Sequence, residues 1–127
     1  FSAAVADFKV VKKSDIKIKK NNELNIKLEK NVDILNFVSN HNSMRPKLVI
    51  GFAAETNNLE DNAIEKLKNK NCDMIIANDV SNRSIGFESD FNEVTIFYKN
   101  NKKEKLFAKN KSLISDEIVE RVNNQFN

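Results

Sequence analysis

Three apolar stretches of the chain end alike, in small residues followed by a carboxylate. They are Ala4-Val5-Ala6-Asp7, Phe52-Ala53-Ala54-Glu55-Thr56 and Ile76-Ala77-Asn78-Asp79. If these stretches are parallel strands of an open sheet, their ends meet at the edge where such sheets bind ligands, and alanines there let a base or ribose approach the backbone. Asp, Asn and Thr also end strands because they form turns and cap helices. The pattern supports a nucleotide-type site and plain turn chemistry about equally.

Lysines are the groups that could neutralise a phosphate. Lys17-Ile18-Lys19-Lys20 lies in a polar segment that could fold over the strand ends or could simply be solvated surface. Lys66 and Lys70 lie four residues apart, at the border of the apolar face of an expected helix. Their ammonium groups could reach an anion, or their stems could cover apolar surface while the charges stay in water. Since a helix rises about 1.5 Å per residue, Lys70 is expected to lie away from the strand ends unless the helix tilts.

Several other site chemistries are excluded. Gly51 and Gly86 are the only two glycines, which is too few for a glycine-rich phosphate loop. The single cysteine, Cys72, and the single histidine, His41, support no disulfide, zinc site or nucleophilic pair. A site in this chain must therefore work by charge neutralisation, positioning and, where one is used, a magnesium ion, for which no ligand is assigned.

Composition narrows the class of protein. A chain of 127 residues with 40% hydrophobic content can bury the core of one domain. The net charge of +3 arises from lysine far more than from arginine, so we expect no nucleic-acid partner. No apolar run approaches the roughly 20 residues that span a membrane, so we expect no membrane partner. With one cysteine, a cytoplasmic location is expected.

Hydrophobic periodicity predicts the elements that must position these groups. We expect a strand in 1–8, a mobile lysine-rich loop over 9–22, a half-exposed strand over 24–28, and a helix from Val32 to about His41 with Asn31 as its N-cap. We then expect a strand over 48–54 buried on both faces, a helix over 59–71 and a buried strand over 73–77. Last come a loop over 78–92, a hairpin through Tyr98 and Leu106, and a helix from Ser112.

The strand, helix and strand between 48 and 77 form a βαβ unit, whose two strands should be parallel. The predicted fold class is therefore α/β: an open, mostly parallel, Rossmann-like sheet flanked by helices, with an edge β-hairpin. The apolar run that opens the chain without a preceding turn predicts an incomplete domain.

The order and spacing of several motifs resemble those of bacterial phosphopantothenoylcysteine synthetase. The motifs are Ala3-Ala4-Val5-Ala6-Asp7-Phe8, Lys17-Ile18-Lys19-Lys20, Asn31-Val32-Asp33-Ile34, Gly51-Phe52-Ala53-Ala54-Glu55-Thr56, Ala77-Asn78-Asp79 and Gly86-Phe87. That synthetase is often fused behind a flavin-dependent phosphopantothenoylcysteine decarboxylase. The resemblance runs over essentially the whole chain.

The resemblance implies a ligase of coenzyme A biosynthesis. The carboxylate of 4′-phosphopantothenate attacks the α-phosphate of CTP to give an acyl-cytidylate and pyrophosphate; the cysteine amine then displaces CMP, with Mg²⁺ assisting. It also implies that residues 1–127 are the C-terminal part of a synthetase domain, that FMN belongs only to a decarboxylase domain outside this chain, and that the synthetase domain forms a homodimer.

The resemblance also implies site residues. Contacts with the cytidine nucleotide fall on Ala3, Asp7, Lys17, Asn31, Val32, Asp33, Ile34, Phe52, Lys66 and Lys70. Ala4 lines the acyl-cytidylate. Lys17 is the activating, catalytic residue, and its charge offsets the phosphates as the anionic carboxylate approaches.

Two departures from the family pattern stand out. Val32 occupies a position where the family usually has proline, which should loosen the first helical turn slightly. The glycine-rich half of the family's synthetase domain is expected upstream of Phe1, so activity of this part alone is not assured.

Two alternative functions remain open. A non-catalytic nucleotide-binding module would bind CTP without forming an acyl-cytidylate. A small RNA-binding domain would need aromatic side chains exposed on a sheet, and this function is strongly disfavoured because most of the phenylalanines occupy positions that look buried.

Overall fold

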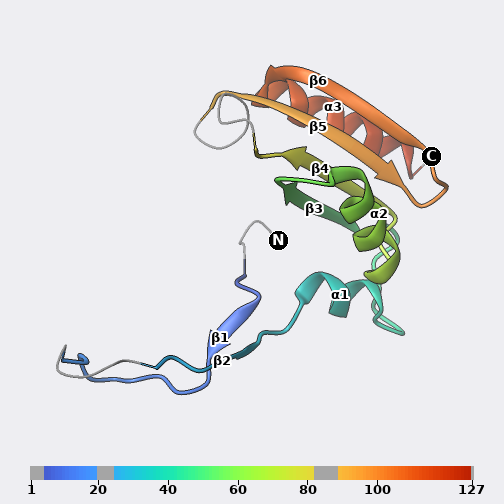
Figure 1. The fold of residues 1–127 in the computed structure, drawn as a ribbon. Helices are drawn as coiled ribbons and strands as arrows, with labels where there is room; N and C mark the ends of the chain where they lie inside the picture. Colours follow the sequence, from blue (N-terminus) through green and yellow to red (C-terminus); the bar gives the residue numbers. More distant parts are fainter. Residues whose placement is uncertain (1–4, 20–24, 82–88, 127) are drawn as a thin grey trace.

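A four-stranded sheet with helices on both faces forms the body of the molecule (Figure 1). The computed structural model describes residues 5–19, 25–81 and 89–126. The sheet order is β3 (Ile50–Glu55), β4 (Met74–Asp79), β5 (Phe91–Tyr98) and β6 (Lys103–Asn110). The remaining elements are β1 (Phe8–Val10), β2 (Leu28–Lys30), α1 (Ile34–Ser39), α2 (Leu59–Asn69) and α3 (Lys111–Asn124). No helix in the described ranges is long and apolar enough to cross a membrane.

The predicted βαβ unit is confirmed. β3 and β4 are parallel, with Ile50 opposite Met74 and Glu55 opposite Asp79. α2 connects them and buries Ala63 and Leu67 against the sheet. The α/β class follows from this unit, as predicted from the spacing of apolar residues.

The described sheet is less parallel than predicted. Its β3–β4 pair is parallel, whereas the β4–β5 and β5–β6 pairs are antiparallel. A parallel neighbour for β4 would need a crossover of about a dozen residues or more, whereas β5 runs antiparallel beside β4. The β5–β6 pair is the predicted edge hairpin, which is confirmed, and α3 packs on it.

The prediction that the strand at 48–54 is buried on both faces is wrong. Ala53 is buried beneath α2 and Gly51 is buried beside Leu35 of α1 on the same face, whereas Phe52 is 69% exposed on the opposite face. The helix on that face, α3, packs against β5 and β6. Phe52 is on the same face as α3, but it lies on β3, beside Ile76 of β4 and at the edge strand farthest from the strands that α3 covers.

The N-terminal part also differs from expectation. β1 and β2 pair antiparallel within the segment predicted as loop and half-exposed strand, and most of their side chains are exposed. β1, β2 and the described residues between them form an extended arm that projects from the body (Figure 1). The expected strand in 1–8 falls partly on residues 1–4, which lie outside the described ranges.

A group of polar contacts around Arg45 and Asp73 joins the helices to the sheet. The Arg45 guanidinium donates to the Asp73 carboxylate at 2.8 Å, to the Ser39 carbonyl at 2.8 Å and to the Asn71 carbonyl at 3.1 Å. The same Asp73 carboxylate accepts the Val49 amide at 2.8 Å. We call this group the Arg45–Asp73 hub. It ties the end of α1 to the turn after α2 and to the start of β3.

Replacing Asp73 with alanine should therefore destabilise the fold. Arg45 and Asp73 are about three-quarters buried, and the variant leaves the guanidinium and the Val49 amide without this partner. We expect a loss of about 1–3 kcal/mol in the free energy of unfolding, measured by urea denaturation. The control is Glu60→Ala, which breaks the exposed Lys103–Glu60 pair and should cost less than about 1 kcal/mol. Equal losses in the two variants would contradict the role of the hub.

Candidate functional site

Two ion pairs link α2 to the neighbouring elements. The Lys66 ammonium lies 3.6 Å from a carboxylate oxygen of Glu55, at the end of β3. The Lys70 ammonium lies 2.9 Å from a carboxylate oxygen of Asp33, at the start of α1. Both lysine side chains are between a quarter and a third exposed, as expected for the border of the buried face. The two lysines, Lys66 within α2 and Lys70 at its C-cap, therefore point toward two different acidic groups.

Glu55 is held in place from two directions. Its second carboxylate oxygen accepts a hydrogen bond from the Asn62 side-chain amide at 2.9 Å, and its backbone carbonyl accepts the Val80 amide at 2.9 Å. Asn62 and Lys66 are four residues apart on α2, so they share a face and both reach the end of the preceding strand. The sequence identified Glu55 as a strand ending but not its contact with Lys66, although the spacing of Asn62 and Lys66 carried that signal.

Asp33 has two roles that meet at one carboxylate. One oxygen accepts the Asn36 amide at 2.9 Å and caps α1, so Asp33 and not Asn31 is the N-cap. The other oxygen pairs with Lys70. Partial burial raises the pKa of Asp33, but the Asn36 amide and the Lys70 ammonium outweigh burial and leave this pKa below its ordinary value. The carboxylate is therefore ionised at neutral pH and available to hold the lysine.

Asn31 and Asp7 meet at the base of the arm. The Asn31 amide donates to the Asp7 carbonyl at 2.8 Å, and its side chain donates to the Ala6 carbonyl at 3.1 Å. Asn31 also accepts the Val32 amide at 3.0 Å through its side-chain oxygen. These contacts bring the two predicted segments together and lead directly into the cap of α1. Val32 and Ile34 are exposed beside them.

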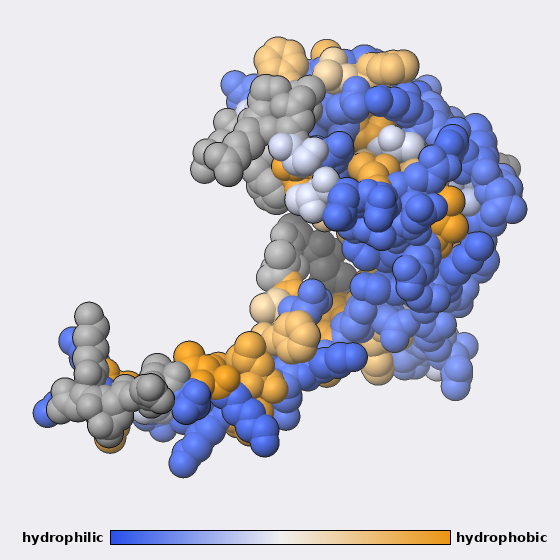
Figure 2. Space-filling view, viewed as in Figure 1, coloured by the Kyte–Doolittle hydropathy of each residue, from blue (hydrophilic) through white to orange (hydrophobic). Residues whose placement is uncertain are grey.

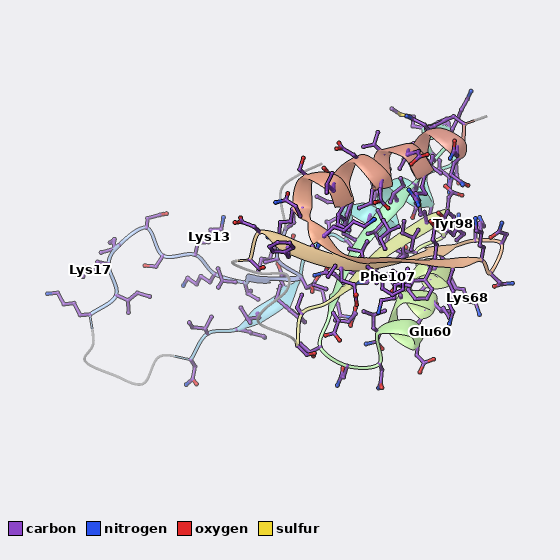
Figure 3. All side chains as sticks on the ribbon, turned by 90° about the horizontal axis from the view of Figure 1, so that it is seen from above. Lys13, Lys17, Glu60, Lys68, Tyr98 and Phe107 are labelled. Carbon is purple, nitrogen blue, oxygen red and sulfur yellow. The ribbon has the colours of Figure 1, made fainter. Side chains whose placement is uncertain are left out.

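Two predicted contacts, Lys17 and Phe52, do not join this group within the described part of the chain. Lys17 lies toward the far end of the arm, away from the body (Figure 3). Phe52 lies on the sheet face opposite α2. Ala3 and Ala4 lie outside the described residues.

The strand ends of β3 and β4 are adjacent, as expected, but they differ in role. Asp79 lies opposite Glu55 in the sheet and accepts both the amide and the hydroxyl of Ser81. These two bonds lower the pKa of Asp79. Asp79 thus forms the turn that the sequence allowed as an alternative, whereas Glu55 faces the lysine on α2.

At Lys66 and Lys70, a bound anion can take the place of the carboxylate partner, Glu55 or Asp33. An ion pair with partial exposure is worth only about 0–1 kcal/mol, so a phosphate can share or displace its carboxylate partner. Within residues 5–19, 25–81 and 89–126, no three His, Cys, Asp or Glu side chains gather where they could hold a metal ion.

Comparison with known proteins adds a family. The model for the DNA/pantothenate metabolism flavoprotein C-terminal domain matches residues 1–126. The "Coenzyme A biosynthesis bifunctional protein CoaBC" of Haemophilus influenzae is 45% identical over 121 residues, which cover 94% of this chain and 30% of that protein. The protein of the same name from Bacillus subtilis is 39% identical over 122 residues, 95% of this chain and 30% of that protein. The chain thus spans under a third of the length of these relatives.

Solved structures agree on the fold. The crystal structure of the C-terminal domain of Coenzyme A biosynthesis bifunctional protein CoaBC superposes with a TM-score of 0.65 and 35% identity, over 80% of this chain and 45% of that one. The DNA/pantothenate metabolism flavoprotein from Streptococcus pneumoniae superposes with a TM-score of 0.61 and 23% identity, over 80% of this chain and 44% of that one. The second likeness is one of fold alone.

Replacing Lys70 with glutamine should raise the pKa of Asp33. The variant removes a hydrogen bond and a positive charge that both lower this pKa, while burial still raises it. The pKa can be followed by NMR from the carboxyl carbon of Asp33. Lys68→Gln, an exposed position on the same helix, is the control and should leave the pKa unchanged. An unchanged pKa in Lys70→Gln would contradict the Asp33–Lys70 contact.

Proposed function

The chain belongs to the family of the DNA/pantothenate metabolism flavoprotein C-terminal domain, and we propose that it serves a step of coenzyme A biosynthesis, the CTP-dependent ligation of 4′-phosphopantothenate to cysteine. The observation that carries the proposal is the family match over residues 1–126, whose relatives are coenzyme A biosynthesis proteins. The lysines beside Glu55 and Asp33 support it, because they are the cations that a triphosphate requires.

The proposed reaction has two steps. A carboxylate oxygen of 4′-phosphopantothenate bonds to the α-phosphorus of CTP, and the bond from that phosphorus to pyrophosphate breaks. The cysteine amine then attacks the acyl carbon, CMP leaves with the bonding electron pair, and the amine loses a proton to solvent. In the first step two anions approach each other, so positive charge at the phosphates lowers the barrier.

Residues of this chain divide that task. Lys66 and Lys70 exchange their carboxylate partners for phosphate oxygens, and Asp33 and Asn31 shape the exposed turn beside them. Lys17 is the activating residue. Mg²⁺ is reluctant to dehydrate and is commonly held by substrate phosphates with only one or two carboxylates. Among the described residues, no three His, Cys, Asp or Glu side chains gather where they could hold a metal ion, which is compatible with this mode of binding. The ion would then arrive bound to the nucleotide.

We further propose that the active form is a homodimer built through the arm. The arm exposes apolar side chains along its length (Figure 2), namely Phe8, Val11, Ile16, Ile18, Ile26 and Leu28. A two-stranded ribbon is at best marginally stable alone in water, so burial of these side chains against a second copy would stabilise it. The proposal also accounts for Lys17, since an arm that crosses to a partner can carry this lysine to the partner's Lys66 and Lys70.

The residue assignments predict a separation of kinetic effects in the full-length protein. Lys66→Gln and Lys70→Gln should each raise the KM for CTP by about tenfold or more, because each removes a charged hydrogen bond to phosphate. Lys17→Gln should lower kcat by about 100-fold, because its charge is needed most in the transition state. Pyrophosphate release with CTP, 4′-phosphopantothenate and Mg²⁺ measures both.

The control for this assay is Lys105→Gln on β6, which removes an equal charge from the exposed Lys105–Glu93 pair and should leave both constants unchanged. Full activity in the Lys17 variant would remove that residue from the mechanism. CTP binding without any pyrophosphate release or acyl-cytidylate in the unsubstituted protein would favour the alternative, a non-catalytic nucleotide-binding module.

Mixing two variants, at a CTP concentration well below the raised KM of the double variant, tests whether Lys17 acts across the dimer. When Lys17→Gln subunits exchange with subunits that carry both Lys66→Gln and Lys70→Gln, each mixed dimer should hold one intact site. Equal mixing should then restore roughly a quarter of the wild-type turnover, since half of the dimers are mixed and one of their two sites is complete. No recovery, in samples whose mass spectra show exchanged subunits, would place Lys17 within its own chain or outside the site.

A further inference from the structure

A hollow lies between α2 and the turn of the β5–β6 hairpin, with a cavity volume of about 160 Å³. Its floor is apolar and consists of Ile64 and Leu67 from α2 and Phe97 from β5. Tyr98 pairs with Met74, the first residue of β4, so the hollow opens at the edge of the sheet opposite the ends of β3 and β4. It is therefore separate from Glu55 and its contact with Lys66.

Four lysines surround the mouth of this hollow. Lys68 comes from α2, Lys99 follows β5, and Lys102 and Lys103 lead into β6. The lining includes one carboxylate, that of Glu60, which pairs with Lys103 at 2.8 Å. Because the Lys102 ammonium lies over the Tyr98 ring, Lys68, Lys99 and Lys103 against Glu60 leave a local excess of two positive charges at the hollow. Figure 3 shows Lys68, Glu60 and Tyr98 on the body of the molecule, far from Lys17.

One of these ammonium groups is held in position at the hollow. Lys99 donates to the side-chain oxygen of Asn71 at 3.0 Å, whereas Lys102 lies over the ring of Tyr98, which packs on the α3 face of the sheet. Asn71 is itself fixed, because its backbone carbonyl accepts from Arg45 in the hub. A cation held in place loses less entropy on binding an anion than a freely rotating lysine does. The mouth of the hollow is in this sense preorganised.

The size of the hollow limits what can enter it. An apolar cavity of about 150 Å³ accommodates benzene, so 160 Å³ suits one group of the size of a six-membered ring. The lysines at the mouth would pair with an anionic group attached to that ring. An apolar floor with a basic rim therefore fits a small molecule that has both an apolar ring and an anionic group. It fits a molecule with only one of these two groups less well.

We propose that the hollow binds a small organic anion composed of one ring-sized apolar group and one phosphate or carboxylate. The ring packs on Ile64, Leu67 and Phe97, and the anionic group lies between Lys68 and Lys99. The site is independent of the proposed ligase activity, because none of the residues assigned to the nucleotide lines it.

The test uses phenyl phosphate and benzoate as probes, with inorganic phosphate and benzyl alcohol as the isolated halves. NMR titrations with each probe give its dissociation constant. Amide shifts in NMR spectra locate the probe. Phenyl phosphate should shift the amides of Leu67, Lys68 and Tyr98 and should bind more tightly than either half. Tighter binding of phenyl phosphate than of benzoate identifies phosphate as the preferred anionic group, and the reverse order identifies carboxylate.

Variants distinguish the site from general charge attraction. Lys68→Gln and Lys99→Gln should each raise the dissociation constant of phenyl phosphate by about threefold, as expected for the loss of one partly exposed ion pair. Lys105→Gln removes an equal charge from the same hairpin but outside the hollow and should have no effect. Equal weakening in all three variants, or shifts spread evenly over the surface, would overturn the proposal. So would binding of inorganic phosphate as tight as that of phenyl phosphate.

Discussion

The Arg45–Asp73 hub is the constraint on which the rest of the structure depends. The end of α1, the turn after α2 and the start of β3 are distant in sequence, yet each contributes a hydrogen-bond partner to it. Because Arg45 donates hydrogen bonds to the carbonyls of both Ser39 and Asn71, α1 and α2 are fixed near each other at their C-terminal ends. α1 has only six residues, so fixing one end also fixes the other. Asp33, at the start of α1, is thereby brought to Lys70, and the candidate site follows from a contact that includes none of its residues.

Gly51 allows α1 to lie this close to the sheet. A Cβ atom at this position would lie 2.7 Å from a terminal methyl group of Ile75 and 2.8 Å from one of Leu35 on α1. Gly51 therefore serves the packing of α1 on the sheet. Close packing of Leu35 on β3 and the polar hub act on the same helix, so the position of Asp33 is determined twice.

What the sequence could predict depended on the range of the interactions involved. Local periodicity identified the βαβ unit and placed Lys66 and Lys70 on the border of α2, because both follow from a repeat within one helix. The cap of α1 was placed two residues too early, since Asn31 and Asp33 are both good capping residues and the choice depends on which side-chain oxygen accepts the Asn36 amide. The exposure of Phe52 could not be predicted, because an apolar strand looks the same whether one or two of its faces are covered. The partners of the two lysines required the fold itself.

The distance between Lys17 and the α2 lysines constrains any mechanism for this chain. Lys66 and Lys70 are each balanced by a carboxylate, so the local charge is near neutral before a nucleotide binds. A triphosphate that displaces Glu55 and Asp33 leaves those two carboxylates beside it, and the net field then opposes the approach of a further anion. Additional positive charge must enter from outside this group. The arm carries a lysine cluster on a scaffold that exposes apolar surface and lacks packing of its own, so the same burial that would order the arm would also deliver the missing charge. In the proposed homodimer, folding of the arm and completion of the site would be one event.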